Sequence, residues 1–414
     1  MSQGLSETSA STASSSTAPI YLDNNSTTPL DPRVLEAMTR VWRECGANPA
    51  SQHGAGRRAR RLIEDARDAI LAMLGGRNEG MKSDRLIFTS GGTEANHLAL
   101  RGMLNPAERS RGLAISSLEH PSIQATAEQL RLQGVPVDKL PVNDSGMVDL
   151  DAVKLLLTRE LSKRPQLISV MLASNETGVV QPVYEIGQMI EESDVLLHCD
   201  AVQGMHELVF LAARLDLATG FRFHRLAAMT VAPHKFHGPI GIGGLLIRHD
   251  VKLQPQMFGG FQQGGLRPGT ENPALAIGFQ KAFELYIQER SARDAGMRQL
   301  RDQLQATLAE ALPTAVVIAQ DSKRVPHTLC ISFPPLDRQA LVMALDLAGV
   351  ACSTGSACAS GSSEPSPTLV AMGLPPDVVG SAIRFSLGGF TTAGEVRSAA
   401  ERIIKAVNQL QRPR

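Results

Sequence analysis

The feature that most constrains the fold of this chain is a repeated pattern of short apolar runs, each ending in polar residues and each followed by a helical pattern. The runs at 85–89, 113–116, 167–172 and 195–198 predict buried strands. Alternating strands and helices are typical of an open parallel α/β sheet, whose strands end at the ligand crevice. We therefore predict one shared pocket for the polar residues near these ends, which are Thr93, His120, Asn175, Asp200, Gln203 and Lys235. Taken singly, a His or Asp at a strand end is more often a local cap, and the prediction depends on six such residues at successive strand ends.

Composition narrows the class of protein. With 414 residues, 43% of them hydrophobic and 20% charged, the chain can bury a large core, and we expect two domains. The formal net charge is zero, so nothing favours a general attraction to nucleic acid or to an acidic membrane. No apolar run approaches the roughly 18 residues that a membrane helix requires. The five cysteines are scattered and odd in number, which favours a reducing, cytoplasmic location over a disulfide framework.

Residues 1–19 are rich in Ser, Thr and Ala and contain almost no large apolar side chain. Such a segment buries too little surface to offset its ordering entropy, so we predict a disordered tail. A transit peptide is the competing interpretation, but the segment lacks Arg and Lys and carries Glu7.

Two local motifs carry chemistry. The glycine-rich turn at 90–96 leads from an apolar run into a helical pattern. Such a turn directs free backbone N–H groups and the positive end of the helix dipole at one point, which suits a phosphate, although a plain strand-to-helix turn is the alternative. The second motif, Ala-Pro-His-Lys-Phe-His-Gly-Pro at 232–239, places Lys235 between two histidines. A fixed, partly desolvated lysine can form a Schiff base, as pyridoxal phosphate (PLP) enzymes require, whereas most lysines are solvated surface residues.

These segments resemble the cysteine desulfurase family, whose members are fold-type I PLP enzymes related to the class-V aminotransferases. The resemblance extends from Ile20 to Thr392 with matching motif order. Its most specific part is 352–366, Cys-Ser-Thr-Gly-Ser-Ala-Cys-Ala-Ser-Gly-Ser-Ser-Glu-Pro-Ser, which matches the family's mobile loop with the sulfur-accepting cysteine, here Cys358. A free cysteine is more often a small buried hydrophobe, but a Ser/Gly-rich loop suits a thiol that must travel.

The resemblance implies a fold as well. We expect an α/β fold of type I, with a large domain containing a mostly parallel seven-stranded sheet and a smaller α+β domain. The implied boundaries are 32–275 for the large PLP-binding domain, and 20–31 together with 276–414 for the small domain, which carries the cysteine loop. The helical patterns at 273–289 and 291–311 predict two successive helices.

The resemblance also implies roles around the cofactor ring. Lys235 would carry PLP and, once freed, would move the α-proton of the substrate. Asp200 would pair with the pyridine nitrogen, because a fixed anion there keeps the ring protonated and electron-withdrawing. Gln203 would donate to the ring hydroxyl, and His120 would stack on the ring and shuttle protons.

Further matches concern the phosphate and the substrate. Thr93 and His234 match phosphate ligands. Thr270 matches a residue that reaches the phosphate of the neighbouring subunit, so the pocket would be complete only in a homodimer. Asn175 and Arg384 match the clamp on the substrate carboxylate, where a planar guanidinium suits two oxygens.

The activity implied by the resemblance is a cysteine desulfurase. The Cys358 thiolate would attack the sulfur of L-cysteine, giving L-alanine and a persulfide for an iron–sulfur assembly or thiolation acceptor. A selenocysteine lyase or another C–S lyase would use the same residues. A catalytically impaired PLP-binding scaffold subunit is the alternative from a different class.

Three departures from the family pattern motivate the scaffold alternative. Ala232 stands where the family usually has Ser or Thr, and Gly389 stands where an Arg is common. The stretch between Asp200 and Lys235 is also longer than the family's by about nine residues, which a surface loop tolerates better than a strand. It is either a surface excursion or a disturbance of the strand that leads to Lys235.

Overall fold

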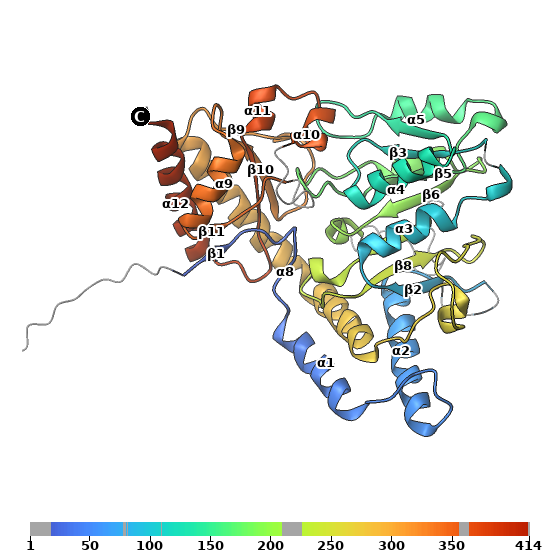
Figure 1. The fold of residues 1–414 in the computed structure, drawn as a ribbon. Helices are drawn as coiled ribbons and strands as arrows, with labels where there is room; N and C mark the ends of the chain where they lie inside the picture. The colour runs from blue at the N-terminus through green and yellow to red at the C-terminus, as the bar shows by residue number, and fades with distance from the viewer. Residues whose placement is uncertain are drawn as a thin grey trace, which may run out of the picture.

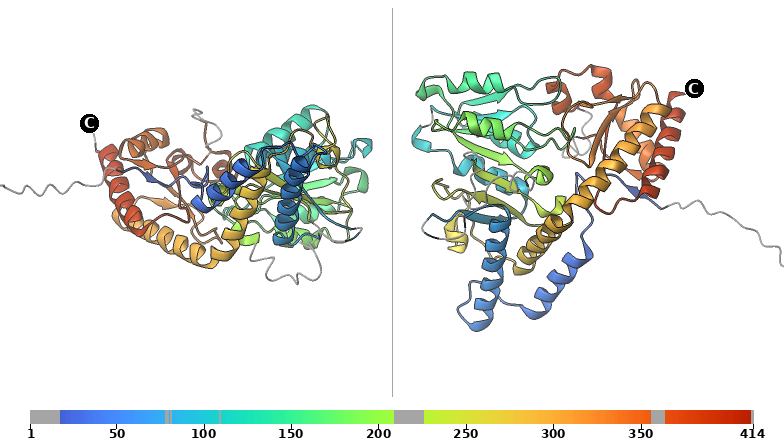
Figure 2. Two further views of the ribbon diagram at one scale, coloured as in Figure 1. Left: turned by 90° about the horizontal axis from the view of Figure 1, so that it is seen from below. Right: turned by 180° about the vertical axis from the view of Figure 1, so that it is seen from behind.

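The computed structural model describes residues 18–77, 80, 82–108, 110–208, 226–355 and 364–412. They form a large α/β unit and a smaller unit beside it (Figure 1). One long helix, α8 (Pro273–Ala311), extends along both units, as the view from behind in Figure 2 shows. Cys358 lies outside the described residues.

The large unit is built on a seven-stranded sheet. Its strands are β2 (Arg85–Thr89), β3 (Leu113–Ser116), β4 (Val137–Leu140), β5 (Leu167–Ser169), β6 (Leu196–Asp200), β7 (Leu226–Val231) and β8 (Gly243–Ile247). They follow the order β2-β8-β7-β6-β5-β3-β4, and every neighbouring pair is parallel except the two that involve β8. The prediction of a mostly parallel seven-stranded sheet is therefore confirmed. Strands β3, β5 and β7 are buried along their whole length, which explains their continuous apolar sequence.

Helices cover both faces of this sheet, and each face has its own apolar core. The helices of the large unit, besides the first half of α8, are α1 (Pro32–Glu44), α2 (Gly54–Met73), α3 (Gly92–Gly102), α4 (Pro121–Leu132), α5 (Leu150–Leu157) and α6 (Val183–Met189). One core joins the sheet to α1, α2, α5, α6 and α8, and the other joins it to α3 and α4. Helix α1 begins at a capped end, with Asp31 accepting from the N–H of Arg33 and Pro32 in the first turn.

The smaller unit contains an antiparallel sheet in the order β12-β10-β9. Its elements are β9 (Val316–Val317), β10 (Thr328–Ser332), α9 (Arg338–Leu347), β11 (Val350–Ala351), α10 (Pro367–Ala371), α11 (Pro376–Gly380), β12 (Ala382–Ser386) and α12 (Ala393–Gln411). Strand β1 (Ile20–Tyr21) pairs with β11. The segment 20–31, called the N-terminal arm below, therefore starts in the small unit and then enters α1 of the large unit. The domain boundaries inferred from the sequence stay a prediction.

The prediction of two helices at 273–289 and 291–311 is wrong, because α8 is continuous over 39 residues. The junction is Glu289-Arg290-Ser291-Ala292, which contains no glycine or proline that would end a helix. Helices α1 and α2 pack on α8, and α12 packs on it as well, so tertiary contacts support it in both units.

The strand that leads to Lys235 is intact. Strand β7 pairs with β6 and β8, with one register shift near Leu197. The disturbed-strand alternative is therefore wrong for 226–235, and the preceding stretch 209–225 lies outside the described residues. As for a membrane span, each helix in the described part of the chain is too short or too polar to cross a bilayer.

Candidate active site

A cavity of about 600 Å³ lies where the carboxyl ends of the parallel strands meet the N-terminal arm and the small unit. The structure brings all six polar strand-end residues to its wall, and His234 and Arg384 join them: Thr93, His120, Asn175, Asp200, Gln203, Lys235, His234 and Arg384. Thr270 is exposed and does not line this cavity. The individual roles of these residues stay predictions.

Lys235 is positioned by the short turn that follows β7. Its Nζ donates to the backbone carbonyls of Asn25 (2.6 Å) and Ser26 (2.8 Å). Thr28 fastens the same turn, because both its N–H and its hydroxyl donate to the carbonyl of His234 at 2.9 Å. The N-terminal arm therefore holds the lysine amine at one place in the cavity.

Asp200 ends β6 with a side chain that is nearly buried. Its Oδ1 accepts from the N–H of Val202 (3.0 Å), and its Oδ2 accepts from Nδ2 of Asn96 (2.7 Å). The same amide group donates to Ser122 Oγ at 2.9 Å. Neutral donors thus hold a buried carboxylate in a fixed orientation.

His120 caps the N-terminus of α4. Its Nδ1 accepts from the N–H of Ser122 (3.2 Å) and lies 2.8 Å from Ser122 Oγ. Because Nδ1 accepts from an amide, the neutral ring carries its proton on Nε2. Burial lowers the pKa of His120; the Asp200 carboxylate opposes this shift and the Lys235 ammonium adds to it.

The phosphate end predicted from the sequence lies at the start of α3. This helix begins at Gly92 with Thr93 next, and the first N–H groups of a helix have no intrahelical acceptor. A Cβ on Gly92 would lie 3.0 Å from a methyl group of Val202, so the turn has little room for a side chain. His234 lies opposite with Nδ1 3.2 Å from Thr27 Oγ, and burial, followed by the Lys235 charge, lowers its pKa to about 4.

Arg384, in the middle of β12, is 2% exposed. Its Nη2 forms an ion pair with Asp23 at 2.7 Å and donates to Ser26 Oγ at 3.0 Å. Its Nη1 donates to the carbonyl of Asn175 at 2.9 Å. Its Nε is buried and has no hydrogen-bond acceptor among the described residues.

Several polar residues of this site received no role from the sequence. Asp23, Asn25 and Ser26 belong to a run of polar residues between β1 and the cap of α1, and an ordinary turn explained that run equally well. Asn96 lies inside α3, where the amide gave no signal of its own. One signal in the sequence could have identified these residues of the arm: every residue at 23–28 has a side chain that can form hydrogen bonds.

Two carboxyl groups are buried beside the cavity. Burial raises the pKa of Glu119, and the nearby Asp200 charge adds to this rise. Its Oε1 accepts from the N–H of Met171 at 2.7 Å, and its Oε2 has no hydrogen-bond partner within the described part of the chain. Burial also raises the pKa of Glu176, whose Oε2 accepts from Ser366 Oγ at 2.6 Å.

The residues present fit PLP. Asp200 is a buried anion at the cavity wall, and a protonated pyridine nitrogen would complement it. The start of α3 offers free N–H groups for a phosphate, and Lys235 offers an amine in the same cavity. Ala232 also lines the cavity and lacks the hydroxyl that the family usually has there.

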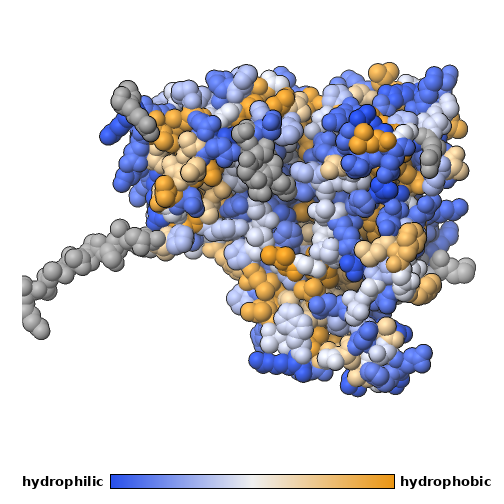
Figure 3. All heavy atoms as spheres, in the orientation of Figure 1, coloured by the Kyte–Doolittle hydropathy of each residue, from blue (hydrophilic) through white to orange (hydrophobic). Residues whose placement is uncertain are grey.

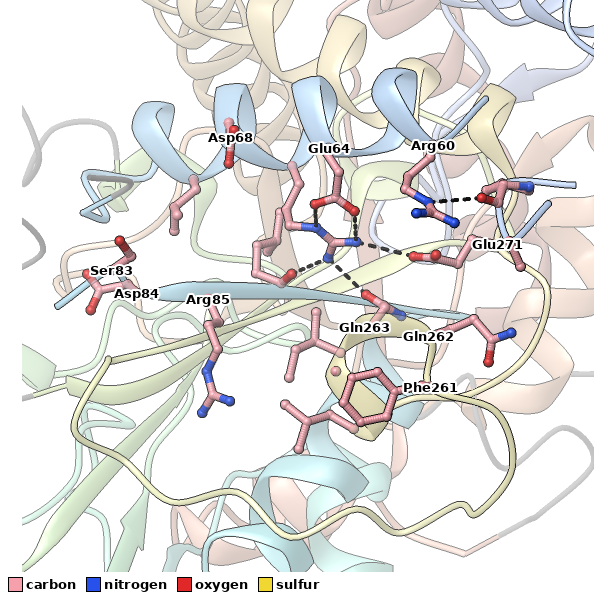
Figure 4. Close-up of a pocket in the computed structure, with 18 residues that line it drawn as sticks. Arg60, Glu64, Asp68, Ser83, Asp84, Arg85, Phe261, Gln262, Gln263 and Glu271 are labelled. Carbon is pink, nitrogen blue, oxygen red and sulfur yellow. Dashed lines mark hydrogen bonds and ion pairs between the residues drawn. The ribbon is translucent and has the colours of Figure 1, made fainter. Parts of the chain in front are cut away.

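A second cavity, of about 620 Å³, lies between α2, β2 and the segment 261–271 (Figure 4). Among its charged side chains, Arg67 forms ion pairs with Glu64 at 3.0 Å and with Glu271 at 3.2 Å. Phe261 stands at its edge and is 86% exposed. This cavity shares no lining residue with the first, so the chemistry described above belongs to the first cavity alone.

Comparisons with known proteins place the chain in a family. The class described as aminotransferase class-V matches residues 20–398, so the chain belongs to the class-V aminotransferases. A cysteine desulfurase of Cereibacter sphaeroides is 38% identical over 95% of this chain and 96% of its own length. One from Trichormus azollae is 36% identical over 95% and 94%. Within its class, the chain therefore belongs to the cysteine desulfurases, a family of PLP enzymes.

Solved structures agree on the fold. A NifS-like protein superposes with a TM-score of 0.83 at 30% identity, covering 95% of this chain and all of its own. A NifS-like protein from Rickettsia africae has a TM-score of 0.81 at 29% identity, with 94% and 99% coverage. A structure described as SspA in complex with cysteine has a TM-score of 0.73 at 27% identity, with 90% and 100% coverage. The predicted fold type I is confirmed.

Proposed function

We propose that this chain takes sulfur from L-cysteine, releasing L-alanine and leaving a persulfide on Cys358. The observation that carries the proposal is the meeting of Lys235, Asp200, His120 and Arg384 at one cavity, in a chain 38% identical to a named cysteine desulfurase. The SspA structure described as a cysteine complex supports the choice of substrate.

The cavity residues would have the following roles in the reaction. When bound, PLP would draw electrons from the α-carbon of the substrate and weaken its C–H and Cβ–Sγ bonds. Arg384 would hold the substrate carboxylate with its free Nε. Lys235, released from the carbonyls of Asn25 and Ser26, would move the α-proton. His120 would hold a proton at Nε2 for the leaving or entering groups.

Cys358 would attack the substrate sulfur as a thiolate. A sulfur–sulfur bond forms, the Cβ–Sγ bond breaks with its electrons passing to the carbon skeleton, and protonation of that skeleton yields alanine. The described ends of the segment that carries Cys358 support this assignment. The carbonyl of Gly355 accepts from Nη1 of Arg384 at 3.4 Å, and Ser366 donates to Glu176, so both ends reach residues of the cavity wall.

A test compares the wild type with Cys358→Ala, Lys235→Ala and the control Cys45→Ala. We expect the wild type and the control to bind PLP with a visible absorbance band, to form alanine from L-cysteine, and to show a persulfide by mass spectrometry of the intact protein. Cys358→Ala should keep the band and lose both products, and Lys235→Ala should lose the band of the lysine-bound cofactor. Failure of the wild type to take up PLP would favour the scaffold alternative, and cleavage of selenocysteine alone would favour the lyase.

We infer in addition that a homodimer completes the site. Thr270 is exposed in this chain, and the segment that leads to it also exposes Met257 (50%), Phe258 (85%) and Phe261 (86%). The face shown in Figure 3 carries apolar patches separated by polar side chains. Exposed aromatic side chains of this kind are typical of protein interfaces.

Light scattering tests the homodimer directly. The wild type should have twice the mass of the chain, and Phe258→Asp with Phe261→Asp should yield monomers with weaker PLP binding. The control Leu347→Asp changes an equally exposed residue (89%) on α9 of the small unit and should leave the dimer intact. A monomeric wild type with full PLP binding would contradict the proposal.

The persulfide would pass to an acceptor protein for iron–sulfur cluster assembly or thiolation. Support comes from relatives named IscS and NifS, which are 35% and 32% identical to this chain. A cytoplasmic location stays a prediction.

A further inference from the structure

His237 connects the turn that carries Lys235 to the small unit. It follows Lys235 by two positions, and its backbone is in the left-handed region with φ of 67°, which is unfavourable for a residue other than glycine. Backbone bonds to the arm hold it there: its N–H donates to Thr28 Oγ at 2.7 Å, and its carbonyl accepts from the N–H of Asp31 at 3.0 Å. This conformation directs the imidazole away from the cavity and toward the segment after β12.

Both nitrogens of the His237 ring are bonded to backbone groups. Nδ1 lies 2.8 Å from the carbonyl of Pro29, and Nε2 lies 3.0 Å from the N–H of Gly389. A carbonyl only accepts and an amide N–H only donates, so the ring is neutral with its proton on Nδ1. Burial lowers the pKa of His237, and so does Arg293, while the Pro29 carbonyl, Asp31 and Glu289 oppose the shift.

The partner segment is fitted closely around the imidazole. A Cβ on Gly389 would lie 3.1 Å from His237 Nε2 and 3.1 Å from Cδ of Arg293. The ring of Phe390 lies 4.3 Å from the His237 ring, centre to centre, and Arg293 lies over the Phe390 ring at 5.4 Å. The glycine at 389, a departure from the family pattern, therefore leaves the space that His237 and Arg293 occupy.

From this geometry we propose that His237 is a positioning residue, which latches the segment after β12 to the lysine turn and so sets the distance between Arg384 and Lys235. Arg384 is in β12, three residues before the segment that begins at Leu387, and Lys235 is two residues before His237. Under the proposed function the substrate bridges these two side chains, which line the cavity from opposite units. The inference rests on the proposed function for its kinetic part alone.

The variant His237→Asn removes the side-chain contact with Gly389 and leaves the backbone bonds of residue 237 in place. Asparagine tolerates a positive φ and its amide can still donate to the Pro29 carbonyl, but it is too short to accept from Gly389. We expect His237→Asn to bind PLP like the wild type. The bonds between the lysine turn and the N-terminal arm are made by the side chain of Lys235 and by the backbone of residue 237, and the substitution changes neither. We expect the KM for L-cysteine to rise about five- to tenfold, as the loss of one hydrogen bond predicts, with a smaller change in kcat.

Hydrogen exchange provides a readout that needs no catalysis. In purified PLP-loaded protein, the amides of 387–391 should exchange faster in His237→Asn than in the wild type, because the Gly389 N–H loses its acceptor. Gly389→Ala disturbs the same contact at the Gly389 end. It should likewise speed the exchange of the amides at 387–391 and raise the KM for L-cysteine. The control His249→Asn changes a histidine next to Asp84, outside the cavity, and should alter neither quantity.

The outcomes separate the latch from the proposed function. Unchanged exchange at 387–391 in both His237→Asn and Gly389→Ala would refute the latch, as would faster exchange with an unchanged KM. If the wild type formed no alanine, the proposed function would fail, and the exchange experiment would still decide whether His237 holds this segment.

Discussion

The substitution Asn96→Ala tests whether the site is held together as we describe. The Nδ2 of Asn96 is shared by two acceptors, Asp200 Oδ2 at 2.7 Å and Ser122 Oγ at 2.9 Å, and Ser122 Oγ lies 2.8 Å from Nδ1 of His120. Asn96 is 1% exposed, so water cannot readily replace its amide. Alanine would leave a buried carboxylate with one donor fewer.

The expected magnitude follows from these two bonds. A hydrogen bond to a charged group contributes about 1.5–3 kcal/mol and one between neutral groups about 0.5–1.5 kcal/mol. Asn96→Ala should therefore lower the free energy of unfolding by about 2–4 kcal/mol. The affinity for PLP should fall as well, because Asp200 and His120 lose their fixed orientations.

Urea denaturation of the PLP-free protein measures the first quantity, and titration of PLP followed by absorbance measures the second. The control Asn408→Ala, exposed on α12, should change the unfolding free energy by less than about 0.5 kcal/mol. If Asn96→Ala were as stable as the control and bound PLP like the wild type, the hydrogen-bond chain from Asp200 to His120 would not organise the site.

Three further outcomes follow from particular contacts. Gly355→Ala should slow alanine formation about tenfold or more while the protein still binds PLP. Gly355 has φ of 90°, and an added Cβ would lie 2.7 Å from Glu176 Oε2. Steady-state rates measure the loss of activity, and absorbance measures the bound PLP. Hydrogen bonds from Arg33 lower the pKa of Asp31 to about 2, so its stabilising effect is complete above pH 4 and is lost as the pH falls toward 2. Asp31→Asn should therefore cost about 1–2 kcal/mol in urea denaturation at pH 7 and almost nothing near pH 2. Burial lowers the pKa of His198 to about 4 from 6.5, so the wild type should lose up to about 3 kcal/mol between pH 6.5 and 4, and His198→Gln should show a flatter profile.

Local patterns in the sequence predicted β2, β3, β5 and β6 of the large sheet and the polar residues near their ends, but not β4, β7 and β8. Parallel strands buried on both faces must be apolar throughout, so β3 and β5 were visible as continuous runs. Strand β7 is buried in the same way, but the long stretch before Lys235 left it unpredicted. Once the sheet is parallel, the carboxyl ends of its strands share one edge, and the meeting of Asp200 and Lys235 at one cavity follows. Helix boundaries marked by caps, such as Asp31 before α1, were predictable for the same local reason.

Local sequence patterns could not predict the contacts between segments that are far apart in the chain. Arg384 pairs with Asp23 across 361 positions, and Lys235 donates to Asn25 across 210. Nothing in the few residues around Asp23 distinguishes a site wall from an ordinary turn, because its partners are elsewhere in the chain. The continuity of α8 was missed for a related reason, since its support comes from helices of both units.

The amino-acid sequence by itself predicted an open parallel sheet and the edge where its chemistry occurs, because the periodicity of strands and helices is a local property. Its resemblance in motif order to a known family implied the fold type and the family. Only the tertiary structure decided how the site is held. The carbonyls of the arm around Lys235, the amide of Asn96 behind Asp200, and the contact of His237 with Gly389 depend on close approaches that folding alone creates. Hydrogen bonds act over about 3 Å, and which groups come that close is fixed by packing of the whole chain.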